Sequence, residues 1–83
     1  MTNKKDIVNN LEVSINILEK ALKEREEELR SLLYVREVSS VEDLETKEDY
    51  SLGFDLQWQI EDLKEYIGDL KSMALKIGAF KNV

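Results

Sequence analysis

The fold is decided by residues 56–77, LQWQIEDLKEYIGDLKSMALKI, in which an apolar side chain recurs at alternating steps of four and three residues. Such steps average 3.5 residues, the repeat that keeps one face of an α-helix against a partner helix. Residues 8–32 have the same spacing, interrupted only at Arg25. We therefore expect an all-α fold with two long helices packed in a coiled-coil-like manner. The apolar positions of the two stretches are Val8, Leu11, Ile15, Leu18, Leu22, Leu29 and Leu32, and then Leu56, Ile60, Leu63, Ile67, Leu70, Ala74 and Ile77.

A chain of 83 residues without proline is expected to form one domain, residues 1–83, with long uninterrupted helices. Ser51 is the predicted N-cap of the second helix, and Gly78 is its predicted C-terminal stop. Ser39 and Ser40 are each followed three residues later by an acid, which resembles a capping box and predicts a helical turn from Val41 to Lys47. The predicted elements are helix one over residues 4–38, a connection over residues 39–51 and helix two over residues 52–78.

The two helices are expected to form an antiparallel hairpin that turns near residue 46. This register places Arg25 opposite Ile67 and Gly68, at a position where the pattern calls for an apolar residue. We expect the stem of Arg25 to lie along the seam and its head to reach Glu65 or Asp69. A polar residue in such a seam fixes register or oligomeric state, and the alternative role is an anchor for an acidic partner.

Further apolar side chains lie outside this seam, and they predict self-association. Tyr66, Met73 and Phe80 are seven residues apart and form a row of their own. Exposed apolar patches mark interfaces, so we expect a homodimer of hairpins that forms a four-helix bundle. A parallel coiled coil of helix two with a second copy is the alternative, because isoleucine and leucine alternate at its core positions. The expected self-association residues are Ile17, Tyr66, Met73 and Phe80.

The charge is negative and unevenly spread. The net charge is −6, yet residues 37–69 alone hold eleven acids and two bases. An acidic surface repels nucleic acid and anionic membranes, so neither is an expected direct partner. A cytoplasmic protein is expected, because no stretch approaches the ~20 apolar residues of a membrane span.

The residues present argue against catalysis. The chain has no histidine and no cysteine, which removes the commonest general base and the thiolate ligands. Carboxylates on both helices are reminiscent of the paired acidic motifs with which all-α nucleotide pyrophosphatases hold Mg²⁺. Lys64, however, stands three residues after Glu61, where a second acid is required. We therefore expect no enzyme, no metal site and no cofactor.

Two functions fit these observations. One is a small acidic regulator or inhibitor that docks on a basic or nucleic-acid-binding protein, by analogy with proteins of phages and mobile elements that blunt host defences. The other is a structural coiled-coil subunit, an assembly or scaffold component whose role is self-association. For the first, aromatic anchors within a charged rim are typical of binding hot spots, although Phe54 and Trp58 would alternatively cap the core. The expected partner-binding residues are Glu42, Asp43, Glu45, Glu48, Asp49, Tyr50, Phe54, Asp55 and Trp58.

Overall fold

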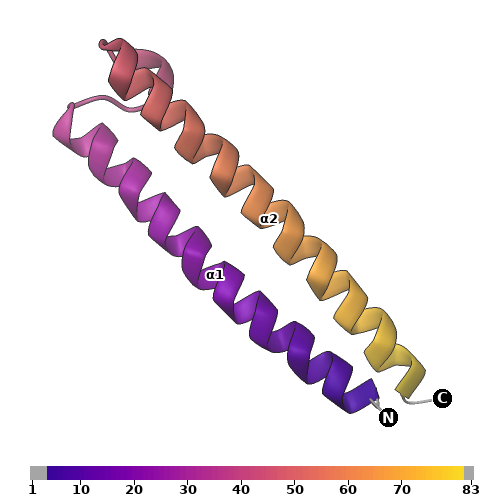
Figure 1. Cartoon of the computed structure of the whole chain (residues 1–83). Helices are drawn as coiled ribbons and strands as arrows, with labels where there is room; N and C mark the ends of the chain where they lie inside the picture. Colours follow the sequence, from indigo (N-terminus) through magenta and orange to yellow (C-terminus); the bar gives the residue numbers. More distant parts are fainter. Residues whose placement is uncertain (1–3, 82–83) are drawn as a thin grey trace.

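The chain folds into a two-helix hairpin. The computed structural model describes the backbone of residues 4–81 and the side chains of residues 4–77. Helices α1 (Lys4–Val35) and α2 (Lys47–Lys81) flank a connection that contains one 3₁₀ turn, η1 (Val41–Asp43). The helices run antiparallel, so α1 begins and α2 ends at one end of the rod and the connection lies at the other (Figure 1). The predicted all-α antiparallel hairpin is confirmed.

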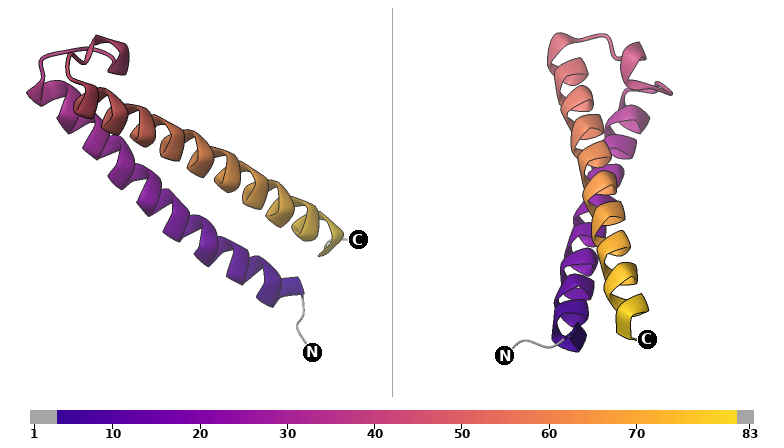
Figure 2. Two further views of the ribbon diagram at one scale, coloured as in Figure 1. Left: turned by 45° about the horizontal axis from the view of Figure 1, so that its top comes forward. Right: turned by 90° about the vertical axis from the view of Figure 1, so that its right-hand side faces the viewer.

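The predicted seam joins the two helices. All fourteen apolar positions of the two repeats are buried or half-buried, and Ile15, Leu56, Ile60 and Ile67 are the most enclosed among them. The molecule is a slender rod, 56 × 17 × 15 Å, whose helices wrap past each other (Figure 2). Two helices cannot enclose an interior, which explains why most of the seam stays half-buried. Because α1 occupies the seam of α2, a second copy of α2 cannot pair through the same residues in this arrangement.

Helix α1 ends at Val35, three residues before the predicted end. The N–H of Glu37 donates to the carbonyl of Tyr34 at 3.1 Å, and the N–H of Val38 donates to that of Leu33 at 3.0 Å. Glu37 has a φ of 57°, in the left-handed region. These are the hydrogen bonds of a Schellman cap, which usually has glycine at the left-handed position. The sequence does not predict this end, because glutamate is rare at the left-handed position of such a cap.

Helix α2 begins at Lys47, five residues earlier than predicted, and Ser51 is not its N-cap. The cap is Thr46, whose hydroxyl oxygen accepts the N–H of Asp49 at 3.2 Å. The Asp49 carboxylate also receives Arg36, with 2.6 Å between Nε and Oδ2, and this ion pair ties the end of α1 to the start of α2. At its other end α2 continues through Gly78 to Lys81, so Gly78 does not stop the helix.

The connection folds back onto α2. Val41 is 1% exposed, Leu44 is buried, and both lie against Gly53. A Cβ at Gly53 would lie 2.9 Å from Leu44 Cδ1 and 3.2 Å from both Val41 methyl carbons. Gly53 therefore lets the connection close over the helix. The predicted turn is present only over Val41–Asp43, and its Ser40 hydroxyl donates to the Asp43 carboxylate at 3.0 Å instead of capping the backbone.

None of the helices described over residues 4–81 carries an apolar stretch long enough to cross a lipid bilayer.

Candidate protein-interaction surfaces

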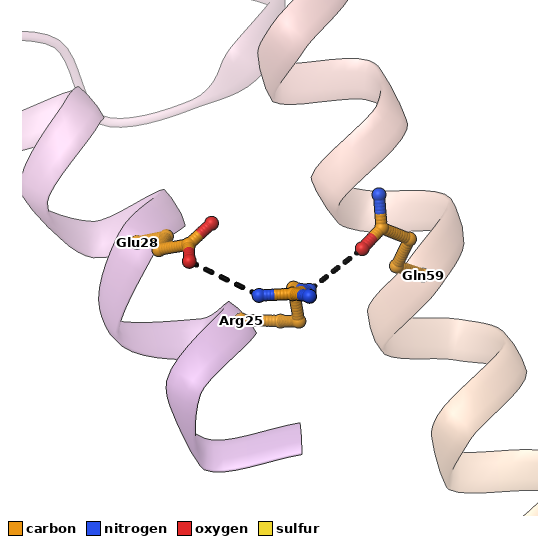
Figure 3. A network of polar contacts seen from close by, with 3 residues as sticks. All are labelled: Arg25, Glu28 and Gln59. Carbon is orange, nitrogen blue, oxygen red and sulfur yellow. Dashed lines mark hydrogen bonds and ion pairs between the residues drawn. The ribbon is translucent and has the colours of Figure 1, made fainter. Parts of the chain in front are cut away.

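The polar interruption of the seam differs from its prediction. Arg25 donates from Nε to Gln59 Oε1 at 2.7 Å and from Nη1 to Glu28 Oε1 at 3.0 Å (Figure 3). We predicted that the head of Arg25 would reach Glu65 or Asp69, and its observed partners are instead Gln59 and Glu28. The predicted register was wrong because the connection occupies residues 36–46, so the chain turns about one helical turn earlier than residue 46. The head of Arg25 bridges the two helices at one side of the seam.

Three aromatic side chains form a ladder along the first turns of α2. The rings of Tyr50 and Phe54 are stacked with centroids 6.3 Å apart, and Phe54 meets Trp58 edge-on at 6.1 Å. The spacing of four residues places all three on one side of the helix. Trp58 is 57% exposed and the other two rings are also exposed, so they do not cap the core of the hairpin. We call Tyr50, Phe54 and Trp58 the aromatic ladder.

A groove of about 730 Å³ lies beside the ladder. Phe54, Trp58 and Ile60 from α2 and Leu29 and Leu33 from α1 supply its apolar lining. Its polar lining contains two acids, two bases and an amide: Glu26, Arg30, Gln57, Glu61 and Lys64. An apolar floor with a charged rim is the general form of a protein-binding hot spot.

The predicted acidic residues lie at the connection end of the rod, but they are not equivalent. Glu42, Glu45 and Glu48 are exposed to solvent. Asp49 is half-buried and held by Arg36, while Asp43 accepts the Ser40 hydroxyl. The last two carboxylates therefore stabilise the connection. Asp55, the remaining predicted acid, is exposed on α2.

A second exposed apolar surface runs along the opposite side of the seam. In the seven-residue repeat, Ile7, Ala21 and Val35 of α1 share one position, and Leu52, Tyr66 and Met73 of α2 share the matching one. A groove of about 650 Å³ includes Val35 and Leu52. We call these six residues the apolar flank. Tyr66 and Met73, both predicted for self-association, belong to it; Ile17 is exposed just outside it, and the side chain of Phe80 lies outside the described residues.

Sequence reasoning missed the part of the ladder groove that comes from α1. Glu26, Arg30 and Leu33 join Trp58 only because α1 lies against α2 in the observed register. No local motif marks them. The ladder itself has a sequence signal, the spacing of four residues between its aromatic members.

Neither the described side chains, as possible metal ligands, nor a comparison with other proteins adds a further assignment. Among the side chains of residues 4–77, no three carboxylates or other potential ligands converge as a metal site would require. No protein-family model matches the chain, and searches of curated proteins and of solved structures found no similar protein.

Proposed function

We propose that this protein is a small, acidic, non-enzymatic binding module that regulates or inhibits a basic protein partner, such as one that binds nucleic acid. The observation that carries the proposal is the exposed aromatic ladder beside the acidic connection end of the rod. The ladder and the exposed carboxylates Glu42, Glu45 and Glu48 form the proposed docking surface.

The ladder supplies the apolar part of such an interface. A fully buried aromatic side chain removes about 150–250 Å² from solvent, and the three members of the ladder are still 44–57% exposed, so about half of that area remains for a partner to cover. Tyrosine and tryptophan are enriched among the residues that dominate binding energy. The stacked rings restrict one another, so less conformational freedom is lost when a partner covers them. The neighbouring groove provides space for a side chain of the partner next to Trp58.

Charge supplies the selectivity. Residues 24–63, which form the connection half of the rod, contain thirteen acids and four bases, whereas the rest of the chain contains eight bases and five acids. A field of one sign at one end attracts a basic surface and orients its approach. The same field opposes phosphate backbones, which favours a protein partner over nucleic acid.

The test is capture from a lysate of the source organism at low and high salt, followed by binding kinetics with the captured protein. Changing Glu42, Glu45 and Glu48 together to Gln is expected to slow association at low salt, and Trp58→Ala is expected to speed dissociation. The matched control changes Glu12→Gln, Glu65→Gln and Asp69→Asn, which are exposed and alter the net charge equally. Equal binding by the two triple variants would contradict the proposal.

A second candidate function is favoured by the apolar flank. An assembly subunit that dimerises into a four-helix bundle would cover this surface. The same capture experiment separates the two functions, because a purely structural subunit retains only copies of itself. The two functions are also compatible, since the flank and the ladder lie on opposite sides of the seam.

A further inference from the structure

We propose that a second copy of this chain covers the apolar flank in an antiparallel arrangement, with the acidic connection end of each copy over the basic end of the other. This inference rests on the self-association proposed above. It adds the face that is used and the direction in which the two rods pair.

The exposed area argues that a partner is needed. The chain exposes 6577 Å². A compact monomer of 9.7 kDa exposes about 5,100 Å², so this rod exposes roughly 1,400 Å² more. One partner's share of a standard protein interface is about 800 Å². The excess is larger than that share, so a lengthwise contact with a second copy has enough exposed surface to form a standard interface.

The composition of the flank identifies the face. Its apolar residues extend from Ile7, near the start of α1, to Val35 and Leu52 beside the connection. Tyr66, midway along α2, is 63% exposed, and Met73 is also exposed. Ser14, Glu28 and Gln59 interrupt this row. Glu28 Oε1 and Gln59 Oε1 already accept hydrogen bonds from Arg25 before a second copy approaches. Both grooves have four charged residues on their linings, so the flank differs from the ladder side in the length of its apolar row along the rod and not in a lack of charge.

Charge decides the direction. The connection half, residues 24–63, has a net charge of −9, and the remainder of the chain has a net charge of +3. A parallel pair places the two acidic halves together, where like charges repel. An antiparallel pair places each acidic half against a basic one. In that arrangement α1 faces α1 of the second copy and α2 faces α2.

Sedimentation equilibrium tests the face. Wild type is expected at twice the monomer mass of 9.7 kDa at micromolar concentration. Met73→Glu is expected to weaken the dimer about thirtyfold or more, the effect of losing an interface hot spot. Leu75→Glu is the matched control, because Leu75 is exposed two residues away and has a repeat position on the other side of α2. A monomeric wild type overturns self-association altogether, and equal weakening by both variants overturns the choice of face.

Introduced cysteines test the direction, since the natural chain contains none. Ala21 lies near the middle of α1. In the antiparallel pair, two copies of the Ala21→Cys variant are expected to form a disulfide with each other under mild oxidation. Two copies of Leu52→Cys are expected not to cross-link, because an antiparallel pair separates them by about 36 Å along the rod. A mixture of Val35→Cys and Leu52→Cys detects the parallel pair, in which these positions meet. A disulfide-linked product in that mixture, from a chain that still dimerises, overturns the antiparallel arrangement and leaves self-association intact. Circular dichroism of each variant confirms that the helices are retained.

Discussion

Substituting each of two glycines of α2 with alanine is expected to change stability in opposite directions. Gly68 is exposed, and a Cβ there would meet nothing within 4 Å. Gly53 is buried, and a Cβ there would approach Leu44 and Val41 closely. The two substitutions are chemically identical and lie in the same helix. Their difference therefore measures the packing of the connection on α2.

The magnitudes follow from helix propensity and crowding. Replacing glycine by alanine inside a helix stabilises it by about 1 kcal/mol, which is the expected gain for Gly68→Ala. At Gly53 the same gain is opposed by overpacking, which typically costs about 1–3 kcal/mol. Val41 yields poorly, because a β-branched side chain has few alternative rotamers and this one is 1% exposed. We therefore expect Gly53→Ala to lower the free energy of unfolding by about 1–2 kcal/mol.

Urea denaturation followed by circular dichroism at 222 nm measures both variants against wild type. All samples need one protein concentration, because the apparent stability of a self-associating chain depends on it. The expected separation between the two variants is about 2–3 kcal/mol. If Gly53→Ala is as stable as Gly68→Ala, the connection does not pack on α2 as described.

Three further substitutions test other parts of the hairpin by the same denaturation assay. Glu37→Gly is expected to raise the free energy of unfolding by about 1 kcal/mol, because glycine adopts the left-handed conformation without strain; a loss of stability would contradict the Schellman cap. Thr46→Ala is expected to lower it by about 1 kcal/mol through loss of the N-cap, whereas Ser51→Ala, the matched control within α2, should change it little. Arg25→Leu is expected to raise it by about 1 kcal/mol, since leucine extends the apolar seam and the lost polar contacts are partly solvent-exposed; a drop would mean that the bridge to Gln59 contributes more than the seam.

The long-range pattern of the helices was readable from sequence, whereas their ends were not. The repeats predicted which side chains line the seam, because a 3.5-residue period depends only on backbone geometry. The ends of α1 and α2 depend on single hydrogen bonds. Glu37 occupies a position where glycine is the usual residue, and the observed cap Thr46 is a hydroxyl residue like Ser51, which was the only cap predicted for α2. An early start of α2 then moved the turn, and with it the predicted partners of Arg25.

The interaction surfaces were predictable only where one helix carries them. The ladder and the row of Tyr66 and Met73 each follow from spacing within α2. The α1 side of the groove near Trp58 depends on register, so an error of one helical turn is enough to hide it. Asp49 shows a different limit. Its charge suggested a binding role, and nothing in the sequence indicated that it also pairs with Arg36 and ties the start of α2 to the end of α1.

The two proposed surfaces place constraints on each other. Since the flank and the ladder lie on opposite sides of the seam, an antiparallel dimer leaves both ladders on its outer faces, one at each end of the bundle. Such a dimer presents two equivalent docking surfaces, and a partner with two basic sites at a matching distance gains affinity by binding both. In the proposed dimer the acidic half of each copy would also lie close to the basic end of the other. A basic partner of such a dimer would have to compete with this attraction between the copies. High affinity would then come mainly from covering the rings of the ladder, while charge would select the partner and speed its approach.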